Sequence, residues 1–111
     1  MQSGRESGDR AIMFLVVWEF EIKPECADRF RLVYGSDGDW VQLFRRDENY
    51  RQSILVQDPS RLHVYLTLDF WNSRQAYEAF KQCHHDAYLS LDQASEDLTL
   101  AERLIGSFEQ V

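Results

Sequence analysis

The chain has 111 residues, of which 44% are hydrophobic and 14% aromatic, and its 12 basic and 19 acidic residues give a net charge of -7. This length and composition predict one globular domain with a packed core. The acidic excess argues against a nucleic-acid partner, because such proteins need a basic surface that displaces counterions from phosphates. The longest apolar run, residues 11–18, is too short to span a bilayer, so we expect no membrane partner.

Residues 1–10 are rich in glycine, serine and charged side chains, and we expect a flexible leader ahead of a single domain at 11–111. The two cysteines, Cys26 and Cys83, fall within predicted helices and match neither a disulfide framework nor a metal-binding spacing. The preferred interpretation is two buried, reduced thiols in a cytoplasmic protein.

A first strand is predicted over residues 12–22, where apolar residues on both faces of its early part indicate a sheet covered on both sides. Pro24 fits the first turn of the helix that follows, and Gly35 ends that helix. A short helix is then predicted from Trp40 to about residue 46, with Asp39 as its N-cap.

A second strand is predicted over residues 50–57, and a turn around Pro59 leads to a third strand over residues 62–71. One face of the third strand is aliphatic, and the other is polar and aromatic: His63, Tyr65, Thr67, Asp69 and Trp71. The hydrophobic period then changes from two to about 3.6, which predicts a strand that ends at Trp71 and a helix capped by Asn72 or Ser73.

The next helix is predicted from about Arg74 to beyond Tyr88, with helical character, unbroken or with one break, as far as Leu98. A last strand is predicted over about 102–109. The order strand, helix, strand, strand, helix, strand predicts a ferredoxin-like α+β fold, in which helices cover one face of an antiparallel sheet. The other face would expose apolar side chains in a monomer. We therefore expect a homodimer that packs two sheets face to face.

Several stretches, together with this element order, carry a family resemblance: Glu21-Ile-Lys-Pro24, the aromatic first helix, Tyr65–Trp71 and Ala76–Phe80. Over roughly residues 11–109 the chain resembles the dimeric α+β barrel superfamily and, within it, the antibiotic biosynthesis monooxygenase-like group. The resemblance implies two sheets paired into a barrel and a pocket between the sheet and the helices of each subunit. Activities in that superfamily include cofactor-free oxygenation of polyphenols, haem degradation and small-molecule isomerisation, and many members have no known activity.

Two residues are candidates for direct chemistry. Trp71 lies near the end of the third strand, where the cofactor-free oxygenases are similar in presenting a tryptophan to the substrate. His84 borders the apolar stripe of the long helix and could take a proton from a phenol or enol, after which the substrate can pass an electron to oxygen. Further candidates for shaping or hydrogen-bonding a ligand are Tyr65, Asp69, Tyr77 and Tyr88. For each of these residues, an ordinary packing role is the alternative.

Other chemistries find less support. The haem-degrading branch has an Asn on the first strand, and this chain has none there, which argues against haem breakdown. His84 and His85 point about 100° apart on a helix and cannot easily share an ion, so we expect no metal and no other cofactor. Two functions stay open: a cofactor-independent monooxygenase-like enzyme acting on a small aromatic or polyketide-like molecule, and a non-catalytic binding or interaction module of the same fold.

Overall fold

One antiparallel sheet organises the computed structural model, which describes residues 13–111; the predicted leader at 1–10 lies outside the described residues. The four strands lie in the order β3-β4-β2-β5. Their bounds are Phe14–Ile22 for β2, Tyr50–Gln57 for β3, Val64–Trp71 for β4 and Thr99–Glu109 for β5. The third predicted strand thus begins two residues late, and the last begins three residues early.

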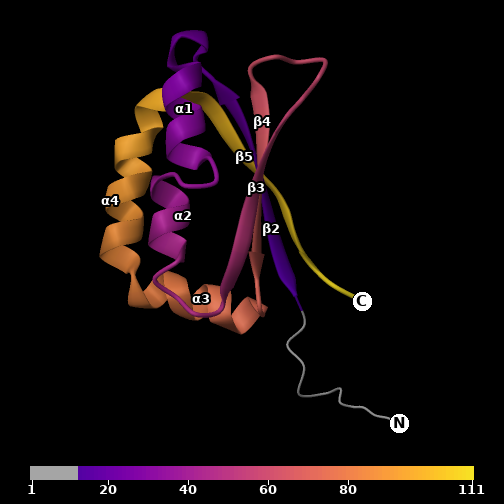
Figure 1. Ribbon diagram of the computed structural model, residues 1–111, viewed down its shortest axis with the longest axis vertical. Helices are drawn as coiled ribbons and strands as arrows, with labels where there is room; N and C mark the ends of the chain where they lie inside the picture. The colour runs from indigo at the N-terminus through magenta and orange to yellow at the C-terminus, as the bar shows by residue number, and fades with distance from the viewer. Residues whose placement is uncertain (1–12) are drawn as a thin grey trace.

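The helices gather on one side of this sheet, and no described helix covers the other side (Figure 1). Two are short 3-10 turns, η1 (Pro24–Cys26) and η2 (Glu96–Leu98). The α-helices are α1 (Ala27–Tyr34), α2 (Asp39–Phe44), α3 (Arg74–Cys83) and α4 (His85–Ser95). The predicted ferredoxin-like α+β fold is therefore confirmed.

The strand register decides which side chains meet the helices. Val16 of β2 pairs with Asp69 of β4, and Phe14 pairs with Trp71. Phe14, Val16 and Trp71 belong to the buried core. Because side chains alternate along a strand, the polar and aromatic face of β4 lies under the helices and its aliphatic face looks away from them. Functional side chains of β4 are thus directed into the layer between sheet and helices.

The tight connection from α1 to α2 fixes the position of α2. A Cβ at Gly38 would clash with the backbone carbonyl oxygens of Leu32 and Val33, so only glycine fits this approach. Gly38 is also the N-cap of α2, and Asp39 is the first helical residue. The predicted Asp39 cap is therefore wrong, although a carboxylate in the first turn still interacts favourably with the helix dipole.

The helix predicted to run beyond Tyr88 is interrupted. α3 ends at Cys83, and His84 has φ -112° and ψ 31°, which is not helical. Ser73 is the N-cap of α3, since its side chain accepts a hydrogen bond from the Ala76 backbone N–H at 3.1 Å. The interruption rotates the residues after it, and Cys83 is exposed.

The cysteine prediction therefore needs correcting. Cys83 is exposed and Cys26 is only partly buried, so the prediction of two buried thiols is wrong. Both are free thiols. Cys83 is the last residue of α3, so the apolar stripe predicted to run through it into a longer helix ends there.

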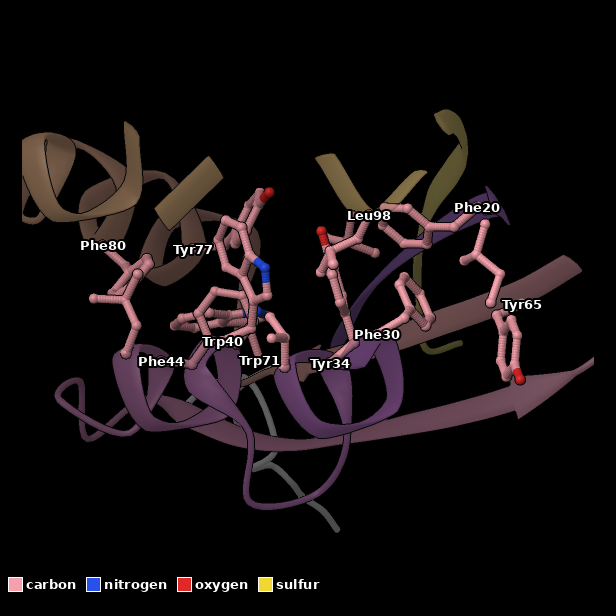
Figure 2. Packing of buried hydrophobic residues seen from close by; sticks show 14 of the residues in the cluster. Phe20, Phe30, Tyr34, Trp40, Phe44, Tyr65, Trp71, Tyr77, Phe80 and Leu98 are labelled. Atoms are coloured by element: carbon pink, nitrogen blue, oxygen red, sulfur yellow. The ribbon is translucent and has the colours of Figure 1, made fainter. Parts of the chain in front are cut away.

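Aromatic rings fill the layer between the sheet and the helices in two groups (Figure 2). The closed cluster consists of Phe44, Tyr50, Trp71, Tyr77 and Phe80. The second group consists of Phe20, Phe30, Tyr34 and Tyr65. Trp40 joins the two, with its ring centroid 6.1 Å from that of Tyr34 and 5.8 Å from that of Phe44.

Candidate functional site

A cavity of about 140 Å³ lies between the sheet and the helices. Figure 2 shows Tyr77 and Trp40 on one side of an open space and Tyr34 on the other, and all three residues line the cavity. Seven aromatic side chains form most of its wall: Trp18, Phe20, Tyr34, Trp40, Phe44, Tyr77 and Tyr88. The other lining residues are Val41, Ser53, Thr67, Asp69, Asp92 and Glu102. An apolar space with a few polar groups at fixed places is the usual character of a small-molecule site.

A chain of hydrogen bonds leads to the carboxylate of Asp69. The Tyr50 hydroxyl donates to Ser53 Oγ at 2.7 Å, and the Ser53 hydroxyl donates to Asp69 Oδ1 at 2.6 Å. These bonds connect β3 to β4, where Ser53 pairs directly with Asp69 across the sheet. The strand register therefore holds the carboxylate in one orientation beside the cavity.

The environment of Asp69 favours its protonated form. Burial raises the pKa of Asp69 to about 6, and the hydrogen bond from Ser53 opposes that rise. A carboxyl group with this pKa is ionised near neutral pH, yet it holds a proton more firmly than an ordinary aspartate. These properties suit a group that accepts a proton during a reaction.

The tyrosines of the cavity wall keep their protons. Burial is the main reason that the pKa of Tyr34 is raised to about 12, and it also raises the pKa of Tyr77 and the pKa of Tyr88. The negative charges of Asp69 and Asp92 raise the pKa of Tyr88 further. All three phenols are therefore hydrogen-bond donors at neutral pH, and none is a base.

The candidate residues from the sequence fall into two sets. Asp69, Tyr77 and Tyr88 line the cavity. Trp71 does not, because it is 0% exposed and enclosed by the closed cluster, with ring centroids of Phe80 and Tyr50 at 5.0 and 5.2 Å. Its indole Nε1 is buried without a hydrogen-bond partner. The structure thus brings three candidates to the cavity and leaves Trp71 outside it, behind the Tyr77 ring at a centroid distance of 5.4 Å.

Tyr65 and His84 lie elsewhere. The Tyr65 hydroxyl accepts a hydrogen bond from Arg31 Nε at 2.8 Å, and its ring packs on Phe30. His84 lies at the break between α3 and α4, where its ring centroid is 5.0 Å from that of Phe80. It borders a separate surface depression with its helix neighbours from Gln82 to Ala87, not the aromatic cavity.

Several lining residues were not singled out as candidates from the sequence: Tyr34, Ser53, Thr67, Asp92 and Glu102. The sequence contains a local indication for one of them: Asp92 follows Tyr88 by four residues and therefore lies on the same face of α4. Ser53 and Glu102 had none, because their positions depend on how β3 and β5 are registered against their neighbours.

Within residues 13–111, no group of three or more His, Cys, Asp or Glu side chains is arranged to hold a metal ion. The helices of this part of the chain are all too short or too polar to cross a membrane. Glu19, which is close to Glu21 in sequence, instead pairs with Arg103 at 3.2 Å and Arg61 at 3.5 Å.

Solved structures with the same fold have low sequence identity to this chain. SnoaB, a cofactor-independent oxygenase from Streptomyces nogalater, is 15% identical, with a TM-score of 0.68 over 91% of this chain and 95% of its own. PA3566 from Pseudomonas aeruginosa is 18% identical, with a TM-score of 0.65 and coverage of 97% and 99%. A conserved protein from Methanosarcina mazei Go1 is 11% identical, with a TM-score of 0.68 and coverage of 91% and 95%.

The sequence itself supplies the family assignment. Comparison with curated proteins gives no match to this sequence. The model of the antibiotic biosynthesis monooxygenase family matches residues 13–88, which run from the first described residue through β2, the helices α1 to α3 and into α4. Since this match spans more than half of the chain, the protein belongs to the antibiotic biosynthesis monooxygenase family.

Proposed function

We propose that this protein is a cofactor-independent oxygenase that acts on a small aromatic or polyketide-like molecule in the aromatic cavity. The observation that carries the proposal is the carboxylate of Asp69, held by Ser53 at 2.6 Å on the wall of a cavity lined mainly by aromatic rings. Flat apolar walls suit a ring system, and the carboxylate is placed where a phenol or enol could give up its proton.

In the proposed reaction, Asp69 replaces His84 as the base, since His84 does not line the cavity. The Asp69 carboxylate takes a proton from the substrate, and the electron-rich anion that remains passes one electron to molecular oxygen. The two radicals combine into a peroxide, which loses water to leave a carbonyl group. One oxygen atom enters the product and the other leaves as water. The two hydrogens of that water come from a CH₂ carbon, or from the O–H and a ring C–H of a phenol, and their removal with insertion of one oxygen atom supplies all four electrons taken by O₂.

Family membership supports the reaction class. The family is described as one of antibiotic biosynthesis monooxygenases, and SnoaB, which shares the fold, is described as a cofactor-independent oxygenase. The pKa of about 6 supports the assignment of the base, because Asp69 is ionised at neutral pH and still holds a proton better than an exposed aspartate. Trp40 and Tyr77 would contact the substrate in this proposal, and Trp71 would support the wall from behind.

We also propose a homodimer through the open face of the sheet. Ile54 and Val56 of β3 are 40% exposed, and Phe108 of β5 is 50% exposed, although all three are large apolar side chains. They pair with Leu68, Leu66 and Leu15, so a continuous apolar surface crosses the sheet on the side without helices. A cytoplasmic location, consistent with free thiols, belongs to the same proposal. Sedimentation as a stable monomer at micromolar concentration would contradict the dimer.

Oxygen consumption tests the proposed activity. We expect uptake of oxygen with an anthrone or quinol, and a loss of at least about 100-fold in kcat in Asp69→Asn, because a positioned base contributes about that much or more. The matched control is Asp86→Asn, which removes a carboxylate from the fully exposed surface of α4. Binding of these compounds without oxygen uptake would overturn the oxygenase and favour a binding module of the same fold. Equal activity of wild type and Asp69→Asn would show that Asp69 is not the base.

A further inference from the structure

The cavity combines aromatic rings with carboxylates, and residues 13–111 contribute no basic side chain to its wall. Asp69 comes from the sheet, and two further carboxylates, the rim pair Asp92 and Glu102, come from α4 and β5. Lys81 lies 4.5 Å from the centroid of the Tyr77 ring, but it pairs with Glu78 at 3.5 Å and is not a lining residue. The cavity is therefore a region of negative potential with low-polarity walls.

Within the described part of the chain, no basic side chain forms an ion pair with the rim pair. Among residues 13–111, ion pairs involve other carboxylates, such as Asp58 with Arg61 and Glu19 with Arg103, and none involves Asp92 or Glu102. Burial raises the pKa of Glu102, and the negative charge of Asp92 raises it further. A positive charge placed between these two side chains would relieve this repulsion.

A second, independent observation shows an unsatisfied polar group on the same wall. Trp40 lines the cavity and is 9% exposed, and its indole Nε1 is buried without a hydrogen-bond partner, although the Tyr34 hydroxyl lies near it. A buried N–H group without an acceptor is costly, so such groups are usually paired with protein, water or ligand. An oxygen atom on a ligand would supply the missing acceptor.

The aromatic walls are also suited to a positive charge. The face of a Trp or Tyr ring attracts an ammonium group, and this attraction is stronger where water is excluded. Trp18, Tyr34 and Tyr88 line the same cavity as the rim pair. The negative charges of Asp92 and Glu102 act on the Tyr34 hydroxyl and the Tyr88 hydroxyl, which indicates that the rim pair and these rings are close together.

We propose that the cavity selects aromatic molecules that carry a protonated amine and at least one oxygen atom, and that it disfavours aromatic anions. The rim pair would hold the ammonium group, the rings would hold the aromatic system, and Trp40 would donate to the oxygen. This inference rests on the proposed function only in taking the cavity as the ligand site. It names the class of ligand, whether or not oxygenation follows.

Three phenols of similar size and different charge test the selectivity. Tyramine carries an ammonium group, tyrosol a neutral hydroxyl, and 4-hydroxyphenylacetate a carboxylate. We expect isothermal titration calorimetry of the full chain to show that tyramine binds about tenfold more tightly than tyrosol, and the acetate at least about tenfold more weakly than tyrosol. High salt should reduce both ratios, since Glu102 is exposed and Asp92 is only partly buried.

Variants of the rim pair show where the selectivity arises. The double substitution Asp92→Asn with Glu102→Gln should bring tyramine and tyrosol to within about twofold of each other. The matched control, Asp86→Asn with Asp97→Asn, changes the net charge equally at exposed residues that do not line the cavity and should keep the tenfold ratio. The salt dependence in the wild-type protein shows, without any substitution, whether the preference is electrostatic.

Three results would overturn the inference: equal binding of the three phenols, a preference for the acetate, or no binding of any of them at millimolar concentration. Loss of selectivity in the Asp86 and Asp97 control would also overturn it, because net charge alone would then explain the preference. Selective binding of tyramine without oxygen uptake from any substrate would leave this inference standing and remove the proposed oxygenase, so the two can fail separately.

Discussion

Trp71 and Asp69 lie two residues apart on the same face of β4, yet their surroundings are opposite. Trp71 is completely enclosed by rings from α2, α3 and β3, whereas Asp69 borders an open cavity. Phe44 of α2 touches both regions: its ring centroid is 5.4 Å from that of Trp71, and it also lines the cavity. One helix of six residues thus separates a packed cluster from a space for a ligand.

Two residues on the same face of one strand therefore have different roles: Trp71 stabilises the fold, and Asp69 provides a reactive group beside the cavity. An enclosed aromatic cluster gains free energy from buried area and ring contacts, and it has no room for a substrate. A carboxylate beside a cavity costs free energy when it is ionised, and a folded protein keeps such a group where it has a use. Substitutions on either side of this boundary should therefore have different consequences.

The largest expected effect is on the closed cluster. Trp71→Ala should lower the free energy of unfolding by about 3–5 kcal/mol, because it removes a fully buried ring and leaves a cavity in the core. Trp18→Ala, at a partly exposed ring that lines the existing cavity, should cost less than half as much. Urea denaturation followed by circular dichroism measures both. Equal losses of unfolding free energy in the two variants would show that Trp71 is no more enclosed than Trp18 in the cavity wall.

Much of the fold is predictable because it depends on local patterns. Alternation along residues 62–71 predicts β4 and its two faces, although β4 begins only at Val64. The change of period after it predicts α3 with Asn72 or Ser73 as the N-cap, and the cap is Ser73. Gly35 marks the end of α1 as predicted, whereas Pro24 begins η1, the 3-10 turn directly before α1. The break at His84 has no equally strong local signal, and this is why one long helix was predicted in place of α3 and α4.

The site is less predictable, because it depends on contacts between distant segments. A tryptophan at the end of a strand has the right position to line a pocket, and only the packing of Phe44 from α2 shows that Trp71 is enclosed. Asp69 was a candidate for its face of the strand, but its partner Ser53 depends on the register of β3 against β4. The aromatic composition predicts rings around a site without indicating which rings leave a space.

The second prediction concerns Asp69, which borders the cavity, and the pH dependence of the free energy of unfolding. The pKa of Asp69 is about 6 in the folded protein and about 3.9 in the unfolded chain, so the folded state binds this proton more tightly. The stabilisation is complete below about pH 4 and is lost as the pH rises through about 6. As the pH rises from about 5 to about 8, deprotonation of Asp69 should lower the free energy of unfolding by roughly 1.4 kcal/mol.

Asp69→Asn removes this contribution and leaves the other titrating groups in place. Relative to wild type, the variant should therefore gain roughly 1.4 kcal/mol between about pH 5 and about pH 8, measured by denaturation at both pH values. Asp86→Asn, at an exposed position on α4, should show no such gain. A constant difference between Asp69→Asn and wild type at both pH values would mean that the pKa of Asp69 is close to that of an exposed aspartate.

The smallest effect tests Tyr50, whose ring belongs to the closed cluster and whose hydroxyl is linked to Asp69. The Tyr50 ring packs against Trp71 at 5.2 Å in the closed cluster, while the Tyr50 hydroxyl donates to Ser53 and so supports Asp69. Tyr50→Phe keeps the ring and removes the hydroxyl, and it should cost no more than about 1 kcal/mol of unfolding free energy.

The same substitution should still be felt at the cavity. Without the Tyr50 hydroxyl, the Ser53 hydroxyl is less polarised and donates more weakly, so the pKa of Asp69 should rise by well under about one unit. Ser53→Ala removes the direct donor and should raise the pKa of Asp69 by about one unit. Carboxyl ¹³C NMR titrations of the three proteins measure the order. If Tyr50→Phe instead destabilised the fold as much as a lost ring and left the pKa of Asp69 unchanged, Tyr50 would belong to the closed cluster alone, and the boundary between the two regions would lie at Ser53.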